Sequence, residues 1–204
     1  MNFFKKNQKI DIIDDDGIIA IANVSAYNAT LSFRENLSWK ELNEFILDKN
    51  KESLFVFATG SENEWTLKFL INEESNKPIF RKTEQFLEVT GNTLYVVSWG
   101  NLTFTLQFRD TLLPDKFNKD LKVKINNGLY RVVVKQLFDP EDYEYDAENK
   151  VNFIVELFSV DSTNKNRIET IAWTENFPND DTVFFSEKDS DTSDFLENLF
   201  NNRK

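Results

Sequence analysis

Carboxylates are the residues of this chain whose type and spacing best suit a functional role. The segment from Asp139 to Glu148, DPEDYEYDAE, holds six carboxylates and two tyrosines in ten residues. It suits a solvated loop between two strands, a protein-binding loop or a metal-binding loop. The tyrosines favour contact with a partner, because Tyr offers rigid, amphipathic area and is enriched in interface cores.

The metal alternative has the least support, because the segment lacks the glycine and terminal glutamate that an EF-hand needs at fixed positions. We therefore assign no metal ligand and expect no cofactor. The predicted partner-binding residues are Asp139, Glu141, Asp142, Tyr143, Glu144, Tyr145 and Asp146. Two more acidic stretches, Asp14–Asp16 and residues 180–194, would add to the same surface if the fold brings them together.

Other catalytic chemistry is restricted by composition. The chain has no histidine and no cysteine, which excludes Ser-His-Asp triads, Cys-His pairs and the usual zinc and iron ligand sets. Its five glycines form no phosphate-binding motif. We therefore expect a protein that is not an enzyme.

Carboxylate chemistry alone stays open, since a glycoside hydrolase needs only two Asp or Glu side chains. Glu156 is the candidate, because it lies in the otherwise apolar run VNFIVELFSV. By strand alternation it shares a face with Asn152 and Ile154. We therefore predict that Glu156 faces outward and has no catalytic role.

Charge narrows the class of partner. The chain has 24 Lys and Arg against 35 Asp and Glu, a formal charge of -11 and a pI near 4.6. Such a charge repels nucleic-acid phosphates and attracts basic proteins, although solubility alone also explains it. Lysines break the N-terminal sequence MNFFKKNQK before a signal-peptide core forms, and no apolar run approaches the roughly 18 residues of a membrane span. We expect a cytoplasmic protein that binds neither membrane nor nucleic acid.

The first elements follow from turn and cap signals. The turn Asp14–Gly17 precedes a branched, apolar run at Ile18–Val24, which predicts a buried strand. Ser38 and Glu41 have the spacing of a capping box, so we predict a helix near 38–49. Its apolar stripe is formed by Leu42, Phe45 and Ile46.

Alternating residues predict strands along the rest of the chain. Leu54–Ala58 and 65–71 are two of them. Around Gly100-Asn101, the runs Leu94–Trp99 and Leu102–Phe108 predict a hairpin, and Asn126–Gly128 predicts a second hairpin between 121–125 and 129–137. Residues 151–160 and 167–173 are expected to pair, and a short C-terminal helix is expected near 192–202. The four tryptophans, Trp39, Trp65, Trp99 and Trp173, are expected to pack in the core.

Taken together, these elements predict a single mainly-β domain over residues 1–204. We expect an antiparallel β-sandwich of about 8–10 strands with one or two short peripheral helices. A βαβ arrangement is disfavoured, because only two helical patterns interrupt the strands.

One segment resembles a known family. Residues Leu121 to Phe158 combine LKVKINNGLYRVVV, an acidic loop and VNFIVELF, with Gly128, Tyr130 and Val132 in alternation. This pattern is similar to that of bacterial β-sandwich proteins of the competence-protein J type, which inhibit a DNA-entry nuclease. The resemblance implies an inhibitor or immunity-type protein that covers a basic active site.

The sequence therefore favours a non-catalytic, acidic binding protein whose partner is a basic protein such as a nuclease. One alternative is a carbohydrate-binding or carboxylate-dependent carbohydrate-active β-sandwich, which would present exposed Trp or Tyr in a concave pocket. The other is a structural or self-assembling domain, which would present an apolar patch or an unpaired edge strand.

Overall fold

A computed structural model describes residues 5–33, 37–50, 53–142, 145, 150–161 and 171–174. Residues Met1–Thr174 form one compact unit, and Glu175–Lys204 form a second unit that lies outside the described residues. The helix expected near 192–202 and the acidic residues 180–194 fall there. The single domain over 1–204 stays a prediction.

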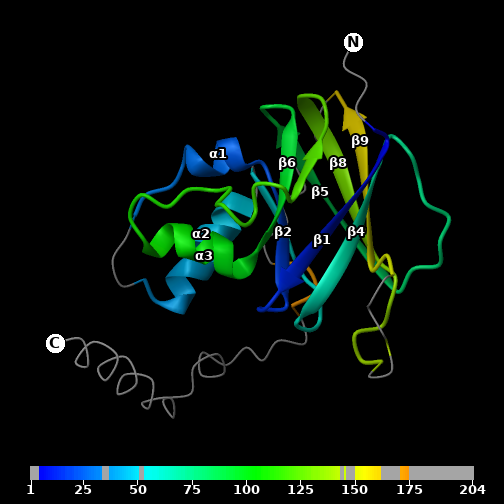
Figure 1. The fold of residues 1–204 in the computed structure, drawn as a ribbon, viewed down its shortest axis with the longest axis horizontal. Helices are drawn as coiled ribbons and strands as arrows, with labels where there is room; N and C mark the ends of the chain where they lie inside the picture. The colour runs from blue at the N-terminus through cyan, green and yellow to red at the C-terminus, as the bar shows by residue number, and fades with distance from the viewer. Residues whose placement is uncertain are drawn as a thin grey trace. The chain divides into compact units, whose positions relative to one another are not determined.

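Two β-sheets form the body of the first unit (Figure 1). Sheet A has five strands in the order β1 (Asn7–Asp14), β4 (Asn63–Ile71), β9 (Phe153–Val160), β8 (Gly128–Gln136) and β5 (Arg81–Val89). Sheet B has four strands in the order β3 (Leu54–Ala58), β2 (Ile18–Ala22), β6 (Thr93–Ser98) and β7 (Lys122–Lys124). The expected mainly-β sandwich with peripheral helices is confirmed. One pair departs from the expected antiparallel order, because β4 and β9 run parallel.

Three helices lie on the side of sheet B, at the left of Figure 1. They are α1 (Val24–Asn28), α2 (Trp39–Asn50) and α3 (Trp99–Gln107). Every residue of β2 is buried, since its odd-numbered isoleucines Ile19 and Ile21 join the inter-sheet core and its other face lies under the helices. Within the described residues, no helix has the length and hydropathy needed to cross a membrane.

The core lies between the sheets and is rich in aromatic side chains. Phe57 packs edge-on against Trp173, and Phe153 meets both Phe57 and Trp65 at centroid distances below 6 Å. Trp65 and Trp99 are fully buried and Trp173 is partly buried against the core. The expected core packing is confirmed for these three tryptophans; the side chain of Trp39 lies outside the described set.

The predicted α2 cap is confirmed. The Ser38 amide donates to the Glu41 carboxylate at 2.9 Å, and the Glu41 amide donates back to Ser38 Oγ at 3.3 Å. Leu42 and Ile46 are buried on the predicted stripe. Strands β1 and β5 were not predicted, although Ile10, Ile12 and Asp14 of β1 alternate with exposed residues over its second half.

The first predicted hairpin is wrong, because residues 99–107 form helix α3. Ser98 is its N-cap, and it exchanges hydrogen bonds with Asn101 in a capping box. Leu102 and Leu106 are four residues apart, so a helix buries both, whereas Phe104 and Phe108 face away. The apolar residues from Leu102 to Phe108 are spaced by two, which is also typical of a strand. The signal of the helix is the pair Ser98 and Asn101, which has the spacing of a capping box before an apolar run.

The second predicted hairpin has the correct strands but the wrong pairing. β7 pairs with β6 in sheet B, and β8 pairs with β5 and β9 in sheet A. The connection crosses between the sheets, because Asn127 is bound to the neighbouring β5–β6 turn. Its side chain accepts from the Asn92 amide at 2.6 Å, and its own amide donates to Asn92 Oδ1 at 3.2 Å.

Glutamine side chains bridge both open sides of the sandwich. Gln8 of edge strand β1 donates to the Lys124 carbonyl at 2.9 Å and accepts from the Lys124 amide at 3.0 Å, which links sheet A to β7. On the other side, Gln85 of β5 donates to the Leu54 carbonyl of β3 at 2.7 Å. Ala172 also bridges to β3 beside Phe57. These contacts cover edges that would otherwise be open to strand addition.

Candidate functional site

The acidic segment after β8 is anchored by stacked aromatic rings. Phe138 lies between Trp65, at a centroid distance of 4.8 Å, and Tyr145, at 4.5 Å, and both stacks are nearly parallel. The Tyr145 hydroxyl accepts a hydrogen bond from Asn152 Nδ2 at 3.0 Å. Asn152 in turn accepts from the Thr66 amide at 2.7 Å. The first part of the loop is therefore tied to the core and to strand β4.

Between these rings the chain makes a tight turn. The Asp139 carboxylate accepts from the Glu141 amide at 2.9 Å, and the Asp139 carbonyl accepts from the Asp142 amide at 3.1 Å. Pro140 packs on Gly60 of the β3–β4 turn so closely that a Cβ on Gly60 would lie 2.4 Å from Pro140 Cβ. Asp139, Glu141 and Asp142 stay exposed. The turn therefore presents carboxylates from a fixed backbone.

Three acidic turns meet at this end of the sandwich (the lower end in Figure 1). Besides the Gly60–Pro140 contact, the Thr59 amide donates to the Gly17 carbonyl at 2.8 Å, which joins the β3–β4 turn to the β1–β2 turn. We call this surface the acidic end. Its exposed carboxylates are Asp15, Glu62, Glu64, Asp139, Glu141 and Asp142.

Of the seven predicted binding residues, the structure describes four. Asp139, Glu141 and Asp142 are exposed, whereas Tyr145 is half-buried and packed on Phe138. Lys150 lies 5.1 Å above the Tyr145 ring and adds one positive charge nearby. The other three, Tyr143, Glu144 and Asp146, lie outside the described residues. Sequence reasoning missed Glu62 and Glu64, because no linear pattern indicates that their turn lies beside Pro140.

The Asp14–Asp16 run supplies only one exposed carboxylate. Asp14 is buried and accepts hydrogen bonds from Thr59 Oγ1 at 2.7 Å and Trp65 Nε1 at 3.3 Å. Burial raises the pKa of the Asp14 carboxyl above its usual value, against the opposing effect of these hydrogen bonds. Asp16 accepts from the Gly100 amide of α3 at 2.8 Å. Asp14 and Asp16 therefore hold turns and helices together.

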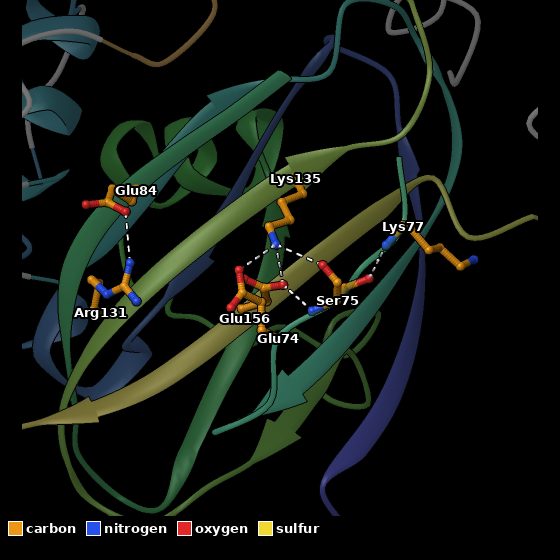
Figure 2. A network of polar contacts seen from close by, with 7 residues as sticks. All are labelled: Glu74, Ser75, Lys77, Glu84, Arg131, Lys135 and Glu156. Carbon is orange, nitrogen blue, oxygen red and sulfur yellow. Dashed lines mark hydrogen bonds and ion pairs between the residues drawn. The ribbon is translucent and has the colours of Figure 1, made fainter. Parts of the chain in front are cut away.

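A second group of charges lies on the outer face of sheet A, where Figure 2 shows Lys135 pointing at Glu156. Their Nζ and Oε1 atoms are 2.6 Å apart, and the two side chains are 8% and 2% exposed. Glu156 faces outward from the inter-sheet core, as its alternation predicts. Its side chain is nevertheless buried, because the segment between β4 and β5 covers it.

The covering contact is made by Ser75. Its amide donates to Glu156 Oε1 at 2.7 Å, and its carbonyl accepts from Lys135 Nζ at 3.3 Å (Figure 2). Glu74 adds a weaker charge contact to Lys135 at 3.9 Å. Because Glu156 is paired to Lys135 and covered by Ser75, it is placed to hold the segment rather than to transfer a proton. No group of three carboxylates within the described residues could hold a metal ion.

Comparison with known proteins gives structural matches alone. No family model and no curated protein matches the chain. Among solved structures, it is similar to ComJ from Bacillus subtilis, an inhibitor of the DNA degrading activity of NucA. The two are 14% identical with a TM-score of 0.43, over 78% of this chain and 99% of ComJ. A structure titled Crocagin biosynthetic gene J matches at 14% identity and a TM-score of 0.45, over 75% of this chain and 97% of that one.

The expected resemblance to the competence-protein J type is thus confirmed as a distant structural match. It extends beyond the segment from Leu121 to Phe158 on which the sequence resemblance rests.

Proposed function

We propose that this chain is a non-catalytic cytoplasmic protein that binds a basic protein partner through its acidic end. One observation carries the proposal: three turns from separate parts of the chain meet and expose six carboxylates. Opposite potentials accelerate encounter and fix orientation at an interface. A surface of this charge suits a partner whose own site is basic.

A nuclease is the partner class that this surface suits best, in an inhibitor or immunity-type role. An enzyme that holds a polyanion needs a positive cleft, and an acidic surface on a rigid base can occupy such a cleft. The charge of the three turns and their position at one end of the sandwich support this class of partner.

The rigidity of the acidic turn is a second observation that supports the proposed binding function. A loop that is ordered before binding loses less conformational entropy when a partner immobilises it. The Trp65–Phe138–Tyr145 stack and the Gly60–Pro140 contact fix the base of the acidic turn. Carboxylates on such a turn are held in place before the partner arrives.

The carbohydrate alternative receives no support from the described residues. Trp65 and Trp99 are buried, and the Arg81 guanidinium covers the Trp173 ring at 4.5 Å from its centroid. The rings of these three tryptophans are therefore occupied by the protein itself and are not free to stack on a sugar.

The test begins with capture of proteins from the native cell lysate on the tagged full chain, followed by identification by mass spectrometry. The captured protein is then purified, and its affinity is measured at low and moderate salt. We expect a basic protein bound near one to one, with an affinity that falls as salt rises.

Two matched double variants locate the site. Glu141→Lys with Asp142→Lys reverses charge at the acidic end, and we expect weaker binding with a smaller salt dependence. Glu73→Lys with Glu88→Lys makes the same change in net charge at exposed positions near the far ends of β4 and β5. Equal affinity of both variants for the partner would refute the acidic end as the site.

A further inference from the structure

A surface beside α3 exposes apolar side chains that the fold does not use. Phe104 lies on the helix face opposite the buried leucines, and Phe108 is the residue that caps the C-terminus of the helix; each is 50% exposed. Their rings stack on each other at a centroid distance of 4.3 Å. Leu112 in the turn after the helix is 58% exposed. We call Phe104, Phe108 and Leu112 the α3 surface.

The backbone that carries this surface is fixed. Tyr27 of α1 donates its hydroxyl hydrogen to the Leu102 carbonyl at 3.1 Å, and burial raises the pKa of Tyr27 to about 12. Asn28 donates to the Leu113 carbonyl at 2.6 Å and accepts from the Leu113 amide at 3.2 Å. Leu113 is thereby held inward while Leu112 faces solvent. Clustered exposed apolar groups on a rigid base indicate an interaction site.

The charges in and after α3 indicate which kind of molecule binds the α3 surface. The chain as a whole is strongly acidic, yet residues 99–124 contain five Lys or Arg and three Asp. Between Phe108 and Leu112 the chain carries exposed charges of both signs, Arg109 and Asp110. The connection that follows adds the exposed charges Lys116, Lys119 and Asp120. A two-fold contact between copies places the same patch on both sides, so it needs both signs to pair with itself. This stretch meets that requirement.

Other binding partners fit the α3 surface less well than a second copy of the chain. The excess of Lys and Arg over Asp in residues 99–124 repels a basic protein, and an anionic membrane repels a chain of charge -11. Strand addition between copies meets edges already bridged by Gln8, Gln85 and Ala172. We propose that the α3 surface is a homodimer interface, in which Phe104 and Phe108 of one copy pack on the same residues of a second copy.

This inference goes beyond the proposed function and does not depend on it. The α3 surface lies on the helix side of the sandwich and the acidic end at the tips of its strands (Figure 1). A dimer of this form leaves both acidic ends free. It predicts two partner molecules for each dimer.

Sedimentation equilibrium of the purified full chain tests the proposal without any partner. We expect a reversible monomer–dimer equilibrium that persists as salt rises from about 0.05 M to about 0.5 M, because salt screens charges but does not screen the apolar contact between phenylalanines. Phe104→Ser with Phe108→Ser should weaken the dimer by at least about tenfold. Ile13→Ser, which removes another exposed apolar side chain far from α3 in the sequence, should leave it unchanged.

Circular dichroism of each variant establishes that it is folded. A wild-type chain that is monomeric at about 0.1 mM would overturn the proposal, because the Kd of any dimer would then lie well above that concentration. The proposal would also be overturned if the variant Phe104→Ser with Phe108→Ser is folded and still forms the dimer. The last experiment measures binding to vesicles of phosphatidylglycerol. If the wild-type chain is a monomer and binds these vesicles through Phe104 and Phe108, the α3 surface is a lipid-binding surface and not a dimer interface.

Discussion

Lys135 Nζ lies 2.6 Å from Glu156 Oε1 on neighbouring strands of sheet A, and both side chains are almost fully buried. The pair is on the outer face of the sheet, away from the inter-sheet core. It is buried because Ser75 lies across it and bonds to both partners. A charge pair in this position binds the β4–β5 connection to the centre of the sheet.

Loss of one member of this pair should cost more than loss of both. Glu156→Leu leaves the Lys135 charge buried without its partner, and we expect the free energy of unfolding to fall by about 3–5 kcal/mol. Adding Lys135→Met should recover part of that loss, because no unpaired charge then remains. Urea titration of the three proteins measures the difference.

The exposed pair Arg131–Glu84 on the same face is the control. Its atoms are 3.1 Å apart, but both side chains are more than a third exposed. Glu84→Gln should therefore change the free energy of unfolding by no more than about 1 kcal/mol. If Glu156→Leu costs as little as this control, the buried pair does not hold the segment.

Asp14 should give the protein a distinctive pH dependence. Its pKa is raised in the folded state, so the folded protein binds its proton more tightly than the unfolded chain does. The contribution of Asp14 to stability is therefore greatest below its unfolded pKa, and it is lost as pH rises through the folded pKa. In Asp14→Asn this titration is absent.

The measurement is the difference in unfolding free energy between wild type and Asp14→Asn from about pH 4 to pH 7. We expect wild type to lose stability relative to the variant as pH rises over this range. A difference that stays constant would show that Asp14 titrates alike in the folded and unfolded chains.

Gly60 should be the least replaceable glycine of the acidic end. It has a φ of +97°, and an added Cβ would clash with Pro140. Gly91 has a φ of +71° but only ordinary contact with Ser25 Oγ at 3.6 Å. Gly91→Ala should cost about 1 kcal/mol through its backbone conformation, and Gly60→Ala should cost clearly more.

Thermal unfolding measures both glycine variants. Gly60→Ala should also raise amide hydrogen exchange at Glu141 and Asp142, because displacement of Pro140 loosens the turn. Equal stability of the two variants would mean that the contact between Gly60 and Pro140 does not order the acidic turn.

The glutamine bridges should protect the sandwich from aggregation. Gln8→Ala removes both hydrogen bonds to Lys124, with an expected cost of about 1–2 kcal/mol, and opens the edges of β1 and β7. Gln85→Ala similarly opens β3. Light scattering during mild heating should show earlier aggregation for the double variant than for Gln107→Ala, whose exposed side chain bonds only within α3. Unchanged scattering would show that other groups protect the edges.

The sequence alone was sufficient for several elements in which one local pattern is unambiguous. Ser38 and Glu41 defined the start of α2, because a capping box acts between residues three apart. Alternation in 65–71 predicted β4, and the apolar run at Ile18 predicted a fully buried strand. The acidic loop stands out in the sequence as well, and Asp139, Glu141 and Asp142 are exposed in it. Its role in binding a partner stays a prediction.

Tertiary structure decided everything that depends on distant partners. Leu102 to Phe108 satisfies both a strand and a helix pattern, and the helix forms where Ser98 caps it and Asp16 binds the Gly100 amide. Glu156 alternates as an outward residue, yet a segment about eighty residues earlier in the chain buries it. The acidic end forms because Pro140 packs on Gly60 and the Thr59 amide donates to the Gly17 carbonyl, two contacts that no linear pattern encodes.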